Sequence, residues 1–332
     1  MALQKWGGVV PELAARYHAE KLPLMFSEML NKNSLKMSDI DCIGVTNAPG
    51  LIGPLLTGLS FAKTLSLLQE IPILGVNHLF AHLEAIFLTH EVSYPYLGCL
   101  FSGGHSLFVL VTSSYSWEFL GSTIDDAAGE AFDKGGKLLG IPYPSGRIID
   151  ELSVFGDPTK IPFPRPMAAK EYGIKMSFSG LKNSFRLKVE ESKLEVNSFP
   201  ENWWKARQSG ENWQFIYDLF ASYQNAITKS LVEKMQLAHE TASKNFKIDT
   251  KALPVVFGGE VACNSSLRAK VKDWAAKKGI EAFFVDPKYC TDNGAMIANW
   301  TYRNLSHIAS FPECLSIDAN SSILNTMKDR FV

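Results

Sequence analysis

The sequence lacks long apolar runs, paired cysteine motifs and an excess of charge of either sign. Its 332 residues carry a formal net charge of -1 and are 20% charged, so we do not expect the chain to bind nucleic acid through bulk charge. An apolar run of roughly 18 residues, which a membrane span requires, does not occur, and the first residues do not follow a signal-peptide pattern. The 5 cysteines are scattered without a CxxC pair, which indicates a reducing cytosol.

What the sequence has instead is an alternation of apolar strands and helices, which is typical of an α/β fold. A chain of this length usually forms two domains, and we expect two lobes with a cleft between them. The expected strands are 41–45, 71–76, 96–101, 107–112, 254–257 and 282–285, and the expected helices are 11–31, 55–69, 124–139, 213–244, 263–278 and 294–304. Residues 141–212 contain proline clusters and polar stretches, which predict an irregular insert with some helix.

Two histidines four residues apart, His78 and His82, form the most informative motif of the chain. Asn77 precedes them and can cap a helix that carries both imidazoles on one face. One cation could bridge the pair, and a carboxylate from elsewhere, such as Asp292 far downstream, would complete an open three-ligand site. The ordinary alternative is a partly buried polar helix face. Leu79 follows His78, so the general base of a His-Glu-x-x-His peptidase is absent.

Two glycine-rich turns are expected at strand ends. Ser102-Gly103-Gly104-His105 joins two strands, and Gly258-Gly259 links a strand to a helix. Glycines let an anion approach backbone N–H groups closely, so both turns are compatible with a phosphate cradle, although such turns are also common for purely structural reasons. We expect the two turns to face each other across the cleft.

The expected helix at 124–139 carries several residues with a predicted role. Asp125 and Asp126 can cap it and suit the positive end of its dipole. Gly129 costs about 1 kcal/mol relative to alanine inside a helix, and such a cost often marks close backbone packing. Asp133 could accept hydrogen bonds from ribose hydroxyls.

Seven segments occur in the order of the motifs of one known family. They are Gly7 to Arg16, Pro49 to Gly53, the helix with His78 and His82, Ser102 to His105, Asp125 to Lys134, Ser177 to Lys182 and Cys290 to Met296. Through this ordered set the chain resembles the bacterial branch of the Kae/Qri/TsaD family of tRNA threonylcarbamoyltransferases.

The resemblance implies an actin-like, sugar-kinase-like ATPase fold of two lobes. It also implies transfer of a threonylcarbamoyl group from threonylcarbamoyl-adenylate to the exocyclic amine of the adenosine just 3′ of the anticodon, in tRNAs that read codons beginning with A. By the motif match, His78, His82 and Asp292 would hold one divalent metal, iron(II) or zinc. The residues implied to bind the adenylate are Leu100, Phe101, Ser102, Gly103, Gly104, Asp133, Gly146, Asp150 and Asn264.

The resemblance further implies a cytoplasmic protein with TsaB and TsaE as protein partners, and TsaC as the source of the adenylate. It assigns no general base; Asp133 is one candidate, although a ribose-binding role suits it better. We expect residues 1–95 to form the N-terminal lobe, 96–303 the C-terminal lobe and 304–332 a tail. The histidines would then come from one lobe and Asp292 from the other.

The chain also departs from the family pattern. The family normally begins upstream of the first matched motif, so we expect the first lobe to lack its first strands and the chain as written to have weak activity or none. Glu260 follows Gly259 where the family continues with glycine or valine. A carboxylate ~4 Å from a phosphate would repel it by about 1 kcal/mol in water-like surroundings and by ~4 kcal/mol in a partly screened cleft, so we expect Glu260 to weaken nucleotide binding. Ser145 and Arg147 replace family glycine and proline beside Gly146.

Three other functions remain open from the sequence. A catalytically impaired scaffold is compatible with the start of the chain and with Glu260. A metallopeptidase is disfavoured by Leu79, and a sugar kinase is disfavoured because the histidine pair would have no role. For RNA contact, Lys175, Lys182, Arg186 and Lys188 could form a modest basic patch or simply a solvated surface, and partner proteins would supply the rest.

Overall fold

The computed structural model describes residues 10–322, and its contacts divide the chain into two units. One unit comprises Met1–Leu88 with Asp292–Val332, and the other comprises Thr89–Thr291. Each unit combines helices with a sheet, so the expected α/β class is confirmed. The expected lobes differ from these units chiefly after residue 291, where the chain re-enters the first unit. Gly7 to Val9 of the opening motif lie outside the described residues.

The first unit is built on a two-stranded parallel sheet. β1 (Ile43–Ala48) pairs with β2 (Ile73–Asn77), and α3 (Ile52–Gln69) connects them. α2 (Pro11–Lys32) packs beside α3, and α11 (Gly294–Arg303) packs on β1 after the chain has returned from the second unit.

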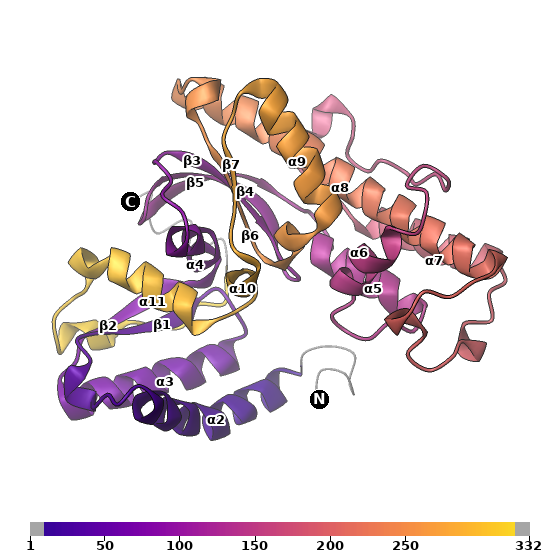
Figure 1. Cartoon of the computed structure of the whole chain (residues 1–332). Helices are drawn as coiled ribbons and strands as arrows, with labels where there is room; N and C mark the ends of the chain where they lie inside the picture. The colour runs from indigo at the N-terminus through magenta and orange to yellow at the C-terminus, as the bar shows by residue number, and fades with distance from the viewer. Residues whose placement is uncertain (1–9, 323–332) are drawn as a thin grey trace. The chain divides into compact units, whose positions relative to one another are not determined.

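Successive side chains of β1 point to opposite faces of the sheet, and each face receives a helix. Val45 packs with Leu59 of α3 on one face. A Cβ on Gly44 would lie 2.0 Å from Oγ1 of Thr301, so the backbone of β1 touches α11 on the other face. α3 and α11 accordingly cover opposite sides of the sheet in Figure 1. The absence of a side chain at Gly44 is what allows α11 to pack so closely.

The second unit contains a mixed five-stranded sheet. Its strand order is β5 (Ser116–Ser122), β4 (Ser106–Ser113), β3 (Tyr96–Phe101), β6 (Val255–Gly258) and β7 (Ala282–Phe284). β3, β4 and β5 are antiparallel neighbours, which confirms the expected hairpin, whereas β3, β6 and β7 run parallel. Sequence analysis did not predict β5, a strand at the sheet edge whose residues are mostly half-exposed.

Helices surround this sheet and supply most of the core. They are α5 (Ala128–Leu138), α6 (Gly146–Ser153), α7 (Ser179–Glu191), α8 (Glu211–Phe246), α9 (Ser265–Lys278) and α10 (Pro287–Cys290). The long helix α8 contacts β3, β4 and β5 on one side and α6, α7 and α9 elsewhere along its length. Phe101, Phe132, Phe185 and Tyr223 are buried together in the main core, which ties α5 and α7 to the sheet.

The expected irregular insert at 141–212 contains α6, α7 and several short helical turns, as the composition predicted. The 3₁₀ helices of the whole described chain are Met37–Asp39, Ala85–Leu88, Lys170–Tyr172, Val196–Ser198, Trp203–Lys205, Thr250–Ala252, Glu260–Cys263 (η7), Leu305–His307 and Glu313–Ser316. Within residues 10–322, none of the helices combines the length and the apolar character that crossing a membrane requires.

The contact between Gly44 and α11 generates a stability prediction. Gly44→Ala should lower the free energy of unfolding by about 1–3 kcal/mol, because the new methyl group overlaps Thr301. Gly58→Ala is the matched control on α3, where the nearest atom would be 3.9 Å away, and it should be neutral or stabilising. Urea unfolding measures both. Equal stability of Gly44→Ala and wild type would show that α11 does not pack on β1 as described, whereas a partial recovery in Gly44→Ala/Thr301→Ala supports the contact.

Candidate functional site

The two histidines lie on α4 (His78–Glu84), which begins immediately after β2. As expected, Asn77 caps this helix, because its Oδ1 accepts a hydrogen bond of 3.0 Å from the Leu79 N–H. The two imidazole rings lie on one face with their centroids 4.6 Å apart. His82 is only 2% exposed, and its buried Nδ1 has no hydrogen-bond partner among the described residues. The ring of His82 therefore engages the rest of this site through Nε2.

Asp292 completes the cluster from the segment just before α11. Its Oδ1 lies 3.3 Å from Nε2 of His78 and 3.1 Å from Nε2 of His82. Asn293 next to it caps α11 by accepting a hydrogen bond from the Met296 N–H. The expectation that this carboxylate would come from the opposite lobe is wrong, because Asp292 belongs to the same contact unit as both histidines.

The position of Asp292 follows from the way α11 is anchored on the end of α4. Nδ2 of Asn299 donates a 2.9 Å hydrogen bond to the carbonyl of Glu84, and Arg303 pairs with the Glu84 carboxylate at 3.4 Å. The Arg303 guanidinium also stacks over the ring of Phe87 at 3.7 Å. Glu84 is buried, so these contacts satisfy a carboxylate that would otherwise be costly. They fix the start of α11 beside the histidines.

These three residues fit a cation. Their ligand atoms all lie within 4.8 Å of one another, and two imidazole nitrogens with one carboxylate are a donor set that zinc and iron(II) accept. Hydrogen bonds from His78 and then His82 hold the pKa of the Asp292 carboxyl well below its usual range. The carboxylate is therefore ionised, which is the form that coordinates metal. Asp292 is exposed, which leaves one side of the cluster accessible to further ligands.

The second unit contains the expected turn at Ser102–His105. The Ser102 N–H donates to the His105 carbonyl at 2.7 Å, and the His105 N–H donates to Ser102 Oγ at 3.1 Å. A Cβ added to Gly104 would meet no heavy atom within 4 Å, so a ligand can approach the turn closely at that residue.

The turn at Gly258–Gly259 lies beside this first turn rather than opposite to it. β3 and β6 are adjacent parallel strands with Leu100 opposite Gly258, so both turns leave the same edge of one sheet. The expectation that they face each other from two halves is therefore wrong. Gly259 has φ +85°, and a Cβ there would lie 2.4 Å from the Phe101 carbonyl, so only glycine fits this position.

One side chain and one helix backbone contact Gly103. Its backbone N–H donates a hydrogen bond to Oε1 of Glu260, the residue that departs from the family pattern. The backbone of α5 also packs against the turn, since a Cβ on Gly129 would lie 2.7 Å from the Gly103 Cα. The close backbone packing expected at Gly129 is thus confirmed.

The remaining residues of the expected adenylate site hold neighbouring elements together. Asp133 on α5 accepts hydrogen bonds from the N–H of Ser145 at 2.7 Å and from its hydroxyl at 3.3 Å, at the start of α6. Burial raises the pKa of Asp133, while these hydrogen bonds act against the rise. Asp150 on α6 accepts from the N–H and Oγ of Ser265, at 2.9 and 2.6 Å. α6 is therefore clamped between α5 and the start of α9, with Gly146 as its first residue.

Asn264 is the cap of α9 and is buried. Its Oδ1 accepts from the Leu267 N–H at 3.0 Å, and its Nδ2 donates to Oε1 of Gln224 on α8 at 2.7 Å. The expected site residues of the second unit thus belong to one continuous series of contacts. The series runs from the glycine turn through η7, the start of α9, α6 and α5 and back to the turn. Sequence reasoning missed Gln224 and Ser265; the Asn-Ser pair before a helix was a usable cap signal, whereas nothing marked Gln224.

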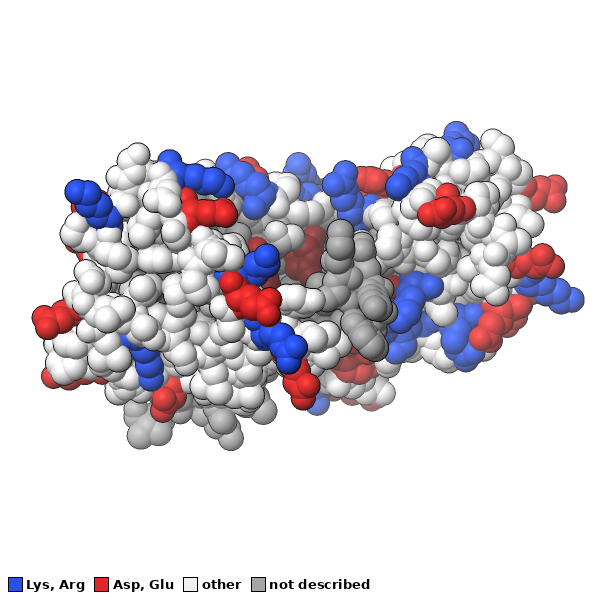
Figure 2. All heavy atoms as spheres, turned by 90° about the horizontal axis from the view of Figure 1, so that it is seen from below, with Lys and Arg blue, Asp and Glu red and all other residues white. Residues whose placement is uncertain are grey.

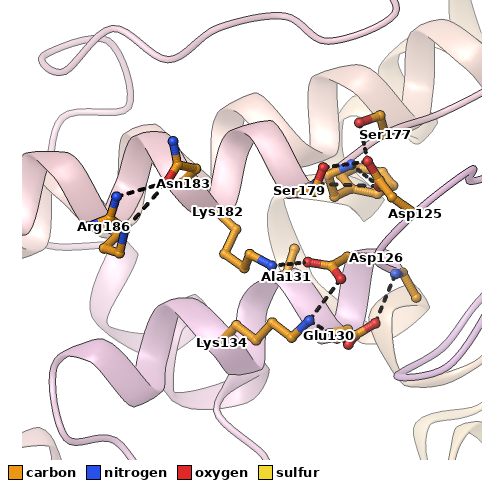
Figure 3. Close-up of polar contacts among 12 residues, drawn as sticks. Asp125, Asp126, Glu130, Ala131, Lys134, Ser177, Ser179, Lys182, Asn183 and Arg186 are labelled. Carbon is orange, nitrogen blue, oxygen red and sulfur yellow. Dashed lines mark hydrogen bonds and ion pairs between the residues drawn. The ribbon is translucent and has the colours of Figure 1, made fainter.

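The expected capping of α5 by Asp125 and Asp126 is wrong. α5 begins only at Ala128, and both carboxylates have other partners: Asp125 is bonded to residues at the start of α7, and Asp126 is bonded to lysines of α5 and α7 (Figure 3). Asp125 accepts hydrogen bonds of 2.5 Å from the hydroxyls of Ser177 and Ser179, and one of 2.8 Å from the Phe178 N–H. These contacts explain the role of the Ser-Phe-Ser segment, which fastens the start of α7 beside α5.

Asp126 bridges two lysines on different helices. Its carboxylate lies 2.8 Å from Nζ of Lys134 on α5 and 2.7 Å from Nζ of Lys182 on α7 (Figure 3). Lys134 also pairs with Glu130 at 2.7 Å, and these carboxylates raise the pKa of the Lys134 ammonium although burial opposes the rise. The cluster is a cross-link between helices with balanced charge.

Two of the four residues of the expected basic patch, Lys182 and Arg186, are neutralised by ion pairs. Lys182 pairs with Asp126, Arg186 pairs with Glu190, and Lys188 lies over the ring of Phe163. On the face shown in Figure 2, Lys and Arg side chains are interspersed with Asp and Glu. Any RNA contact near these residues therefore needs rearranged ion pairs or charge from a partner.

The chain thus combines an α/β fold, a histidine–aspartate cluster whose ligand atoms fit a metal ion, and a glycine turn that an anion could approach. The comparisons with known proteins are more specific. The model of the TsaD family, described as tRNA N6-adenosine threonylcarbamoyltransferase, matches residues 1–299. This chain belongs to the TsaD family.

Relatives that carry the name tRNA N6-adenosine threonylcarbamoyltransferase are similar over most of their length. The protein of Geobacter sulfurreducens is 44% identical over 293 residues, which are 88% of this chain and 79% of the relative. That of Thermotoga neapolitana is 40% identical over 325 residues, which are 96% of this chain and 89% of the relative. Among solved structures, component A of the (R)-2-hydroxyglutaryl-CoA dehydratase of Acidaminococcus fermentans is 13% identical with a TM-score of 0.42, and the match covers 87% of this chain and 83% of that one.

The histidine–aspartate cluster predicts metal retention. Wild type should retain about one divalent ion per subunit after dialysis, and His82→Ala should lose most of it, because a ligand is removed from an open three-ligand site. His18→Ala, which removes an exposed histidine of α2, is the matched control and should retain the metal. Elemental analysis by mass spectrometry measures all three. Equal metal content in wild type and His82→Ala would refute the assignment of a metal site to these residues.

The contacts of Asp125 predict a dependence of stability on pH. Partial burial opposes ionisation of Asp125, but the hydrogen bonds from Ser177, Ser179 and Phe178 outweigh it and lower the pKa below its ordinary value of 3.8. A carboxyl whose pKa is lower in the folded than in the unfolded state stabilises the fold at pH above its unfolded-state pKa. This contribution disappears as the pH falls through its folded-state pKa. Asp125→Asn should therefore cost about 1 kcal/mol at pH 7, and the difference from wild type should shrink below pH 3.8.

Urea unfolding between pH 3 and 7 tests this, with Asp273→Asn as the control. Asp273 is an exposed partner of Lys277 on α9, and its removal should change stability little at any pH. A difference between Asp125→Asn and wild type that persists unchanged at the acidic end would contradict the assignment.

Proposed function

We propose that this protein transfers the threonylcarbamoyl group from threonylcarbamoyl-adenylate to the exocyclic amine of the adenosine just 3′ of the anticodon, in tRNAs reading codons that begin with A. The observation that carries the proposal is membership in the TsaD family by a chain in which His78, His82 and Asp292 lie together. Such a reaction takes place in the cytoplasm, which is the location we propose.

In this proposal His78, His82 and Asp292 hold one divalent metal, iron(II) or zinc. Such a metal would keep a net positive charge and open coordination positions, since two neutral imidazoles and one carboxylate do not cancel its charge. We assign adenylate binding to the turn from Leu100 to Gly104, with Asp133, Gly146, Asp150 and Asn264. The support is that contacts join all of these residues into one continuous series within the second unit.

The chemistry assigns distinct tasks to these residues. A C–N bond forms between the adenosine amine and the carbamoyl carbon, the bond from that carbon to the phosphate oxygen breaks, AMP leaves with the bonding electrons, and the amine gives up a proton. The amine is a weak nucleophile, so positioning must supply much of the rate. Backbone N–H groups of the turn would hold the phosphate, and the second oxygen of Asp133 would accept ribose hydroxyls.

An exposed apolar face supports the proposal of protein partners. Residues of α3 that are exposed include Ile52, Leu56, Leu67 and Leu68, and the neighbouring α2 exposes Tyr17, Leu24, Met25 and Met29. On α3, Ile52, Leu56 and Leu67 lie on one side of the helix and form one stripe, whereas Leu68 lies on another side. Clusters of exposed apolar side chains of this kind often mark a protein contact. We propose that TsaB and TsaE are the partners and that one of them covers this stripe.

A specific observation favours one alternative, a catalytically impaired scaffold. The Glu260 carboxylate occupies the Gly103 N–H, which the adenylate would need. A scaffold of this kind would bind protein partners without transferring the group. A metallopeptidase has no such support, because Leu79 stands where its general base would be.

Transfer to tRNA tests the proposal directly. The chain, supplied with TsaB, TsaE, threonylcarbamoyl-adenylate and tRNA, should form the modified adenosine, which mass spectrometry of the digested tRNA detects. Gly129→Ala should lower kcat/KM by about a hundredfold, since its methyl group displaces the Gly103 turn. Gly180→Ala is the matched helical control, because its nearest neighbour would lie 3.8 Å away.

Two outcomes would contradict the proposal. Complex formation without any modified adenosine would favour the scaffold, and cleavage of protein substrates that depends on His82 would favour the peptidase. Equal activity of Gly129→Ala and Gly180→Ala would refute the assignment of the Gly103 turn to the adenylate site.

A further inference from the structure

Glu260 makes a contact whose chemistry is that of a bound anion. It is the first residue of η7, and its Oε1 accepts the N–H of Gly103 from a position 157 residues away in sequence. A Cβ on Gly103 would lie 2.8 Å from the same oxygen, so the carboxylate lies directly against the turn. A carboxylate on a glycine-turn amide makes the same kind of charge-assisted hydrogen bond that a phosphate oxygen makes.

The backbone fixes this placement. β6 runs parallel to β3 up to Gly258, and Gly259, in the left-handed region at φ +85°, lies against the Phe101 carbonyl. The chain therefore leaves β6 close to the turn that leaves β3. The residue after Gly259 is the first whose side chain can extend toward Gly103, and in this chain that residue is Glu260.

We propose that Glu260 is an internal competitor for the phosphate of the adenylate, and that it sets how strongly this protein distinguishes a nucleotide from a nucleoside. The inference rests on the proposed function, because it takes the Gly103 turn as the phosphate site. One N–H cannot donate a full hydrogen bond to two anions, and the two anions repel each other. A phosphate must therefore displace the Glu260 side chain, whereas an uncharged nucleoside need not.

The contact also has an alternative, purely structural interpretation. Glu260 could hold the turn in shape, in which case its removal would change the binding of every ligand to the same extent. AMP and adenosine separate the two interpretations, because they share the base and the ribose and differ in the phosphate. The ratio of their affinities isolates the contribution of the phosphate.

The experiment is calorimetric titration of the purified full chain with AMP and with adenosine. Glu260→Gln keeps the size of the side chain and an acceptor for the Gly103 N–H, and Glu260→Gly removes both. Glu281→Gln is the matched control, because it removes one exposed carboxylate of the same unit near β7. Thermal unfolding checks that each variant is folded.

We expect Glu260→Gln to raise the affinity for AMP by about tenfold, which is about 1.4 kcal/mol. The affinity for adenosine should change by no more than about twofold. Glu260→Gly should raise the affinity for AMP at least as much, and Glu281→Gln should change the affinity for neither ligand. An unchanged ratio of AMP to adenosine affinity in both Glu260 variants, with binding intact, overturns this inference alone. If neither ligand binds to wild type or to any variant, the nucleotide site itself is refuted and the proposed function with it.

Discussion

The return of α11 to the first unit is the constraint on which the metal cluster depends. Gly44 of β1 leaves room for Thr301, and Glu84 at the end of α4 receives both Asn299 and Arg303. These contacts bring the start of α11 beside the histidine helix, and Asp292 lies immediately before that start. The carboxylate thus reaches His78 and His82 because a helix far away in sequence is packed on the same small sheet. The cluster is a property of one unit, and it forms without any assumption about the placement of the other.

In the second unit the parallel pairing of β3 with β6 has a comparable effect. It places two glycine turns side by side at one edge of the sheet, and α5 supports the first turn through Gly129. Asp133 and Asp150 then connect α5, α6 and α9 through Ser145 and Ser265. Carboxylates that were expected to contact a ligand hold neighbouring elements together. A side chain that is already fixed in this way would lose little entropy on binding a ligand.

The same architecture explains why one residue can alter the site. A glycine turn attracts any anion that comes within reach, and the chain supplies one in Glu260. Just before α5, Asp125 and Asp126 are satisfied by hydroxyls, an N–H and two lysines (Figure 3). Asp125 and Asp126 therefore have internal partners, whereas the Glu260 carboxylate accepts the N–H of the glycine turn that we propose as the phosphate site.

The sequence by itself determined the α/β class, most helices and strands, the cap at Asn77 and the residue types of the cluster, because periodicity and capping are local properties of the chain. It did not predict the edge strand β5, the partners of Asp125 and Asp126, or that the two glycine turns are neighbours. Only the tertiary structure decided that Asp292 joins the histidines within one unit and that Glu260 reaches Gly103. Both contacts join residues more than a hundred positions apart, and such pairs are set by how whole helices and strands pack, which no local pattern encodes.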